Sequence, residues 1–172
     1  MIDIGANIGE FAMAVAPRVG KVIAIEPDKL AYACLKENAK ISPGVIFPVN
    51  YGVGECTGKK TLFLASDTAD TSFIEPDKYS EKIEVLIYTL KDLLSELEVD
   101  FNEIGLIKIE AEGYEHEILQ GCLPSLKVKY YSVNCDPERL GESPLEEVRE
   151  LLERHGYSVV ENGCKVYGVL NV

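Results

Sequence analysis

Short apolar segments alternate with amphipathic helical patterns along most of the chain, and this alternation constrains the fold more than any other feature. Such an alternation is typical of a parallel sheet with helices on both faces. Strands in such a sheet are buried on both sides, so they read as short apolar runs. The predicted core strands are Ile2–Ile4, Val22–Ile25, Val45–Val49, Leu106–Ile109 and Tyr130–Asn134.

Three of the intervening segments have helical signals. Thr89 and Asp92 form a capping-box pattern before four leucines that share one helical face. Ser143 is predicted to cap another helix, with Pro144 at its first position and Gly156 as its left-handed end. A third helix is predicted from Asp28 to Asn38, with three residues facing inward: Leu30, Ala33 and Cys34.

The C-terminal part predicts an antiparallel ending. Ser158–Val160 and Val166–Leu170 flank Asn162-Gly163, a dipeptide suited to a hairpin turn. The predicted fold is therefore α/β: a Rossmann-like, doubly wound, mostly parallel sheet with an antiparallel C-terminal hairpin strand.

A long insertion lies between the third and fourth core strands. It contains two further predicted strands, Lys60–Leu64 and Ile83–Tyr88, separated by the polar loop from Ser66 to Tyr79. Connections of this length in a compact domain are often functional. We expect this loop to contribute to the choice of substrate through polar residues, namely Asp67, Asp70, Thr71 and Ser72.

Length and charge limit the class of protein. With 172 residues, 47% of them hydrophobic, the chain fits a single domain over residues 1–172. No apolar run approaches the roughly 20 residues of a membrane span, and Met1–Gly5 lacks the basic flank of a signal peptide, so we predict a cytoplasmic protein. A net charge of −12 and the lack of a Lys/Arg cluster oppose binding to nucleic acid. The sequence does not indicate an oligomeric state.

Cysteines and histidines give no sign of a metal site. The five cysteines include no C-x-x-C pair, and we expect them to be buried apolar thiols in a reducing compartment. The two histidines, His116 and His155, lie far apart and belong to no ligand motif.

The chemical signal is strongest at the opening, DIGANIGEF from Asp3 to Phe11. Here a strand ends in an acid, a glycine turn follows, and a helix begins. Gly5 and Gly9 would let backbone N–H groups approach a ligand closely. Doubly wound sheets bind nucleotides at this place, the carboxyl ends of their strands.

The spacing of the turn excludes two common nucleotide-binding motifs, the dinucleotide turn and the P-loop. A dinucleotide turn reads G-x-G-x-x-G, but Asn7 and Glu10 occupy its second and third glycine positions, and no G-K-[ST] of a P-loop follows. Asp3 and Asn7 instead suit a ligand with an ammonium and a carboxylate. Glu26, at the end of the second strand, is placed to accept hydrogen bonds from both ribose hydroxyls.

These residues resemble the FkbM-type family of class I S-adenosylmethionine-dependent methyltransferases. The resemblance covers the chain from its first residue to about Gly121 and has its blocks in the family's order. The K-I-x-x-E-G-x-E block is more specific than the first two. The matching segments are DIGANIGEF at Asp3–Phe11, AIEPD at Ala24–Asp28, YTLKDLL at Tyr88–Leu94 and LIKIEAEGYEHEILQG at Leu106–Gly121.

The resemblance implies a seven-stranded sheet, the cofactor S-adenosylmethionine, and roles for individual residues. The cofactor-binding residues it implies are Asp3, Gly5, Ala6, Asn7, Gly9 and Phe11 around the methionine part, Glu26, Pro27 and Asp28 at the ribose, and Asn50, Tyr51 and Gly52 near the adenine. The wall facing the methyl group and the acceptor is implied to contain Lys108, Glu110, Glu112 and Gly113.

Two departures from the family pattern bear on activity. Glu110 stands where the family usually has an aspartate one methylene shorter, which would alter how the acceptor is positioned. The chain also begins directly at the first core strand, whereas relatives carry residues before it. We therefore expect the domain to lack an N-terminal segment that helps to cover the cofactor.

The implied reaction is attack of an acceptor oxygen on the sulfonium methyl. Family analogy suggests O-methylation of a hydroxyl on a small molecule or glycan. The predicted catalytic residues are Glu110, Glu112 and His116 as candidate bases and Lys108 as an orienting cation. His116 can equally be a surface residue of its helix, Lys108 can be purely structural, and Glu115 and Glu117 are expected on a solvated helix face.

Two other classes of function stay open. One is a non-catalytic Rossmann-like binding module, which Glu110 and the missing N-terminal segment allow. The other is a nicotinamide-dependent oxidoreductase, against which the glycine spacing argues.

Overall fold

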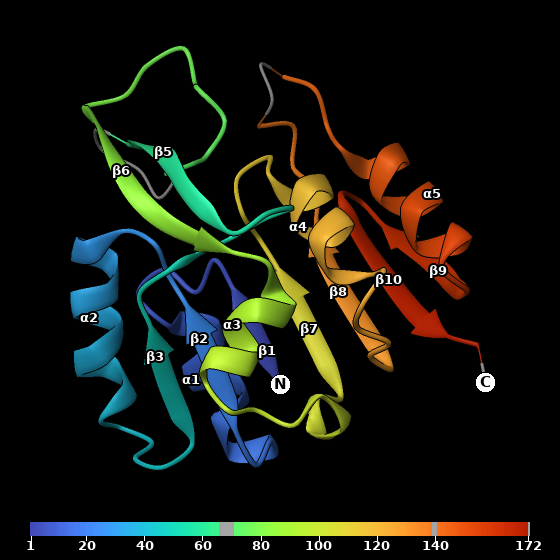
Figure 1. Ribbon diagram of the computed structural model, residues 1–172, viewed down its shortest axis with the longest axis horizontal. Helices are drawn as coiled ribbons and strands as arrows, with labels where there is room; N and C mark the ends of the chain where they lie inside the picture. Colours follow the sequence, from blue (N-terminus) through green and yellow to red (C-terminus); the bar gives the residue numbers. More distant parts are fainter. Residues whose placement is uncertain (66–70, 139–140, 172) are drawn as a thin grey trace.

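Residues 1–65, 71–138 and 141–171 are described by the computed structural model, and they form a seven-stranded sheet with helices on both faces (Figure 1). The strand order is β3-β2-β1-β7-β8-β10-β9. Pairing is parallel from β3 to β8, and β10 runs antiparallel to β8 and β9. The strands are β1 (Ile2–Ile4), β2 (Val22–Ile25), β3 (Ile46–Val49), β7 (Leu106–Ile109), β8 (Tyr130–Asn134), β9 (Tyr157–Asn162) and β10 (Lys165–Leu170). The predicted Rossmann-like sheet with its antiparallel hairpin is confirmed.

The helices lie in two layers because successive residues of a strand point to opposite faces. In β2, Val22 and Ala24 pack in one apolar cluster with α1 and α2, whereas Ile23 and Ile25 pack in the other with α3, α4 and α5 (Figure 1). The helices are α1 (Glu10–Val15), α2 (Lys29–Ala39), α3 (Leu90–Glu96), α4 (Glu115–Cys122) and α5 (Leu145–Arg154), with short 3-10 turns η1 (Ala16–Arg18) and η2 (Phe101–Glu103). None of the helices in the described part of the chain has the length and apolar character to cross a membrane.

The inward face of α2 differs from the prediction. The three residues predicted to face inward are exposed: Leu30, Ala33 and Cys34. The buried residues are instead Leu35 and Ala39, one position out of phase with the predicted set. Leu35 lies against the β1–α1 turn, where a Cβ added to Gly9 would come within 2.6 Å of its Cδ1. This close tertiary contact fixes the rotation of α2, and periodicity alone does not reveal it.

Helix α3 begins as predicted, with one extra participant. Thr89 Oγ1 accepts the Asp92 N–H at 3.1 Å. In a capping box the side chain three residues after the cap accepts the N–H of the cap residue. Here Thr57 lies between the two groups, because its Oγ1 accepts the Thr89 N–H and donates to Asp92 Oδ2 at 2.5 Å. The first turn of α3 is therefore tied to the chain just before β5.

The C-terminal helix and hairpin are each displaced by one residue from their predicted boundaries. Helix α5 begins at Leu145, whose N–H Ser143 Oγ accepts at 3.3 Å, and Gly156 follows its end with a φ of 90°. In the hairpin, Asn162 still pairs with Lys165, so the turn residues are Gly163 and Cys164. A φ of 60° at Gly163 is favourable at the first central position of such a turn.

The cysteine prediction is wrong for three of the five. Cys122 and Cys135 are buried, as expected of apolar thiols, but Cys34 and Cys56 are exposed and Cys164 is partly exposed. Cys34 is exposed because α2 is rotated as described above. All five are free thiols.

A second, three-stranded sheet lies beyond the carboxyl ends of the main strands (Figure 1). It contains the two strands predicted in the insertion, β5 (Gly58–Leu64) and β6 (Glu81–Tyr88), and β4 (Gly52–Val53), which is too short for sequence patterns to reveal. β6 lies in the centre, parallel to β4 and antiparallel to β5. This small sheet covers the edge at which doubly wound sheets bind ligands.

Candidate cofactor and active site

A cavity of about 310 Å³ lies between the small sheet and the carboxyl ends of β1, β2 and β7. This is within the range of about 300–1,000 Å³ typical of small-molecule sites. The predicted site residues that line it are Gly5, Ala6, Asn7, Phe11, Glu26, Pro27, Asp28, Tyr51, Lys108, Glu110 and Glu112. The predicted site residues outside its lining are Asp3, Gly9, Asn50, Gly52, Gly113 and His116.

The turn after β1 is held by backbone contacts to its neighbours. Gly5 and Ala6 donate their N–H groups to the Ile25 carbonyl at 3.1 and 3.0 Å. Gly5 has a φ of 72°, and a Cβ there would lie 1.7 Å from the Glu110 carbonyl oxygen. Glycine is therefore required at residue 5 because the end of β7 presses against it, a tertiary reason that differs from the predicted close approach of a ligand.

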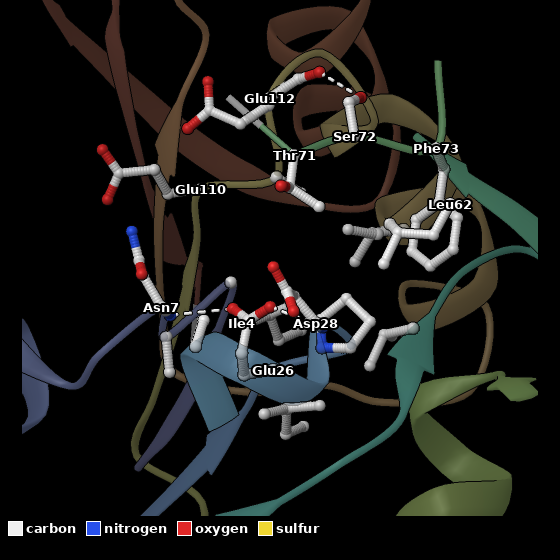
Figure 2. Close-up of a pocket in the computed structure, with 18 of the residues that line it drawn as sticks. Ile4, Asn7, Glu26, Asp28, Leu62, Thr71, Ser72, Phe73, Glu110 and Glu112 are labelled. Atoms are coloured by element: carbon white, nitrogen blue, oxygen red, sulfur yellow. Dashed lines mark hydrogen bonds between the residues drawn. The ribbon is translucent and has the colours of Figure 1, made fainter. Parts of the chain in front are cut away.

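Glu26 and Asn7 meet at the floor of the cavity (Figure 2). The Glu26 carboxylate accepts the Asn7 N–H at Oε2 and the Asp28 N–H at Oε1, both at 2.8 Å. Only 6% of Glu26 is exposed, and this burial raises its pKa to about 7 although the two N–H groups oppose the shift. The turn and the acid of the second strand thus form one continuous surface.

Lys108 ties β7 to the turn after β1. Its Nζ lies 3.0 Å from Asp3 Oδ1, 3.0 Å from Glu110 Oε2 and 3.2 Å from the Gly5 carbonyl. Burial lowers the pKa of Lys108, but the attraction of Asp3 and then Glu110 outweighs it, so the pKa is raised and the ammonium stays charged. Lys108 thus makes ion pairs with two carboxylates and donates a hydrogen bond to the Gly5 carbonyl.

Asn134, at the end of β8, belongs to this group and was not predicted. Its Nδ2 donates to Glu110 Oε1 at 3.0 Å and to Asp136 Oδ2 at 2.7 Å. The sequence contained a usable signal, because Asn134 ends a predicted parallel strand as Glu26 does. Polar residues at that position in neighbouring strands meet at one edge of the sheet.

The turn between β7 and α4 has two residues with positive φ, Glu112 at 48° and Gly113 at 90°. Glu115 Oε1 accepts the Ala111 and Gly113 N–H groups at 2.8 and 3.3 Å, which holds this turn. The prediction that Glu115 lies on a solvated helix face is wrong, since it is only 2% exposed. Its place in the first helical turn lets the side chain fold back onto the preceding backbone.

The insertion closes the cavity from above through Ser72 and Phe73 (Figure 2). Ser72 is 5% exposed and donates from Oγ to the Glu112 carbonyl at 2.6 Å. Phe73 packs against Tyr114, with ring centroids 5.3 Å apart. Thr71 also lines the cavity, whereas the predicted acceptor residues Asp67 and Asp70 lie outside the described residues.

Three of the predicted site residues that do not line the cavity have other surroundings. Asn50 Nδ2 donates to the Glu26 and Pro27 carbonyls at 2.8 and 3.1 Å, which shapes the chain after β2. Gly52 lies beneath Phe73, so close that a Cβ would be 2.5 Å from the ring. His116 faces Gln120 along α4, with 3.4 Å between their Nε2 atoms. Across the described residues, no cluster of three or more His, Cys, Asp and Glu side chains is suited to hold a metal ion.

The strand order and the cavity at the carboxyl ends define a class I methyltransferase fold, and solved structures agree. An FkbM methyltransferase from Methylobacillus flagellatus KT has a TM-score of 0.65 and 18% identity, over 98% of this chain and 42% of that protein. Precorrin-6y C5,15-methyltransferase from Geobacter metallireducens GS-15 has a TM-score of 0.54 and 17% identity, over 98% of this chain and 77% of that one. The N-terminal domain of human METTL16 in complex with SAH has a TM-score of 0.52 and 18% identity, over 99% and 61% of the two chains.

The family follows from the sequence. Residues 3–159 match the methyltransferase FkbM domain, so the chain belongs to the FkbM methyltransferase family. The predicted resemblance is confirmed, and the family favours a methyltransferase over the nicotinamide-dependent alternative. No curated protein sequence matches the chain, and the chain spans about two fifths of the length of the M. flagellatus protein.

Proposed function

We propose that the chain binds S-adenosylmethionine in the cavity and transfers its methyl group to a hydroxyl oxygen of a small molecule or glycan. The observation that carries this proposal is the meeting of Asn7 and Glu26 at the ends of β1 and β2. That arrangement places the turn and a buried carboxylate beside one cavity in a chain of the FkbM family. The human METTL16 domain, which shares the fold, is in complex with SAH.

The donor set of the cavity fits such a cofactor. An ionised carboxylate has about four acceptor positions, and Glu26 uses one on each oxygen for a backbone N–H. Each oxygen therefore keeps a position for one hydroxyl of a ribose diol. The remaining proposed cofactor contacts follow the family roles and line the cavity: Gly5, Ala6, Asn7 and Phe11 near the methionine part, and Pro27, Asp28 and Tyr51 near the ribose and adenine. Gly9, Asn50 and Gly52 do not line it, and we propose that they support these contacts by shaping the adjacent backbone.

Asp3 and Lys108 act indirectly in this proposal. Asp3 is fully buried and forms an ion pair with Lys108, which also forms an ion pair with Glu110 and donates to the Gly5 carbonyl. Lys108 therefore positions Glu110 and the turn, and Asp3 keeps Lys108 charged.

The bound cofactor supplies an activated methyl group, so the chain's task is to orient the acceptor and remove its proton. Glu110 and Glu112 line the same cavity and are the proposed bases (Figure 2). His116 does not line the cavity, so we place the base at one of the two glutamates.

The acceptor class rests on charge. Carboxylates line the cavity and the chain carries a net charge of −12, which opposes binding of a phosphate backbone. The fold does not exclude RNA by itself, because M. jannaschii tRNA m1G37 methyltransferase shares it with a TM-score of 0.52. An uncharged hydroxyl compound is the acceptor that we propose.

The proposal is tested by calorimetric titration with S-adenosylmethionine and S-adenosylhomocysteine. Glu26→Gln should weaken binding of both about tenfold or more, since hydrogen bonds to charged groups contribute about 1.5–3 kcal/mol. Glu103→Gln, at an exposed glutamate in η2, is the matched control and should bind as the wild type does. Lack of binding by folded wild-type protein would refute the proposal.

The reaction is tested by following S-adenosylhomocysteine formation with a panel of sugars and glycosides. Methyl transfer to a hydroxyl that is lost in Glu110→Gln or Glu112→Gln would support the assigned bases. Cofactor binding without turnover on sugars, glycosides or RNA would favour the binding-module alternative, and turnover on RNA alone would contradict the acceptor class.

A further inference from the structure

The Glu110 carboxylate is bound at each oxygen by a side chain from a different strand. Lys108 of β7 places Nζ 3.0 Å from Oε2, and Asn134 of β8 donates to Oε1 at 3.0 Å. Both partners are themselves fixed, Lys108 by Asp3 at 3.0 Å and Asn134 by Asp136 at 2.7 Å. A glutamate side chain that is 42% exposed would otherwise move among several rotamers. These contacts hold its charge in one place.

The Glu110 carboxylate carries a negative charge that faces the cavity. Lys108 is the one cation lining the cavity among the described residues, and two carboxylates, Asp3 and Glu110, share it. When all three groups are ionised, one negative charge is left over. Asp3 is fully buried outside the lining, so Glu110 is the carboxylate of this group that faces the cavity. Four further carboxylates line the same cavity: Glu10, Glu26, Asp28 and Glu112.

Such a cavity distinguishes ligands by charge. S-adenosylmethionine carries a sulfonium in addition to its amino and carboxylate groups, whereas S-adenosylhomocysteine has a neutral sulfur at the same position. In a partly enclosed cavity a fixed carboxylate attracts a cation more strongly than in water. The charge is also already in place before the ligand binds, so no rearrangement opposes the attraction.

We propose that Asn134 and Lys108 hold Glu110 as a fixed negative charge by which the cavity binds S-adenosylmethionine in preference to S-adenosylhomocysteine. This inference rests on the proposed function and assigns to Asn134 a positioning role. It implies that methyl transfer, which converts the sulfonium into a neutral thioether, weakens binding and promotes release of the product. The carboxylate would then strengthen binding of the cofactor and give no such attraction to the product.

The test is a pair of calorimetric titrations, one with each ligand, on wild type and three variants. Glu110→Gln removes the charge and should weaken S-adenosylmethionine binding about tenfold while changing S-adenosylhomocysteine affinity less than about twofold. Asn134→Leu releases one side of the carboxylate and should lower the preference by about threefold. Glu110→Asp keeps the charge but is too short to reach both partners, so its preference should fall as in Asn134→Leu.

Glu10→Gln is the matched control, because it removes one carboxylate from the same lining at an exposed residue where water screens the charge. Its effect on the preference should stay below about twofold. Equal weakening of both ligands by Glu110→Gln would overturn the charge preference. An unchanged preference in Asn134→Leu and Glu110→Asp would overturn the positioning role. A wild type that binds neither ligand would overturn the proposed function itself, together with this inference.

Discussion

Gly5→Ala offers the sharpest test of how the turn is built. The added methyl would lie 1.7 Å from the Glu110 carbonyl oxygen and 2.9 Å from its carbon, and both are backbone atoms that cannot swing away. The substitution also puts a Cβ on a residue with a φ of 72°. Left-handed backbone costs about 1–2 kcal/mol for a residue with a Cβ, and overpacking costs about 1–3 kcal/mol.

The expected loss is therefore about 2–5 kcal/mol of unfolding free energy, a large part of the roughly 5–15 kcal/mol of an ordinary domain. Urea denaturation measures it directly. Gly44→Ala is the matched control, because Gly44 has a φ of 76° and open space where its Cβ would lie. That variant should lose only the conformational part, about 1–2 kcal/mol. Equal losses in the two variants would refute the claim that the end of β7 dictates glycine at residue 5.

Three further outcomes are expected. Burial raises the pKa of Glu26 from 4.5 to about 7, so between these pH values the folded chain holds a proton that the unfolded chain releases. The unfolding free energy measured in urea should therefore fall as the pH rises from 4.5 to 7, and Glu26→Gln should flatten that fall. Leu35→Ala, at a buried residue of α2, should lower the unfolding free energy measured in urea by about 2–5 kcal/mol, and Leu30→Ala, at an exposed one, by less than about 0.5 kcal/mol. The reverse order would contradict the rotation of α2. Ser72→Ala removes the hydrogen bond to the Glu112 carbonyl and should lower the unfolding free energy by about 1–2 kcal/mol. An unchanged unfolding free energy would contradict closure of the insertion on the β7–α4 turn.

Local features of the site could be predicted from the sequence because they depend on neighbours along the chain. The turn from Asp3 to Gly9 follows a strand and precedes a helix, and Glu26 ends the next strand. Parallel strands with helical connections bring such ends to one edge of the sheet. The meeting of Asn7 and Glu26 is a consequence of this topology, and no long-range contact had to be known.

The features that sequence reasoning missed depend on contacts between distant segments. Which side of α2 faces inward is set by Leu35 against Gly9, and two faces of that helix have similar apolar spacing. Glu115 looks like a surface residue by its type and position, yet it folds back onto the turn that precedes α4. Asn134 ends a predicted strand, which was a usable signal for the edge of the site, but its partner Glu110 is identified only by the folded structure.

We expected Glu110 to be a departure from the family pattern, and its longer side chain has partners elsewhere in the same chain. The longer side chain was expected to disturb acceptor positioning, yet its carboxylate reaches Lys108 and Asn134, each at 3.0 Å. An aspartate would withdraw the carboxylate by roughly 1.5 Å, the length of one carbon–carbon bond. From 3.0 Å such a withdrawal carries at least one contact beyond hydrogen-bonding distance. Glutamate at residue 110 and asparagine at residue 134 therefore form one unit. Substitution of either residue alone should loosen the position of the carboxylate at residue 110.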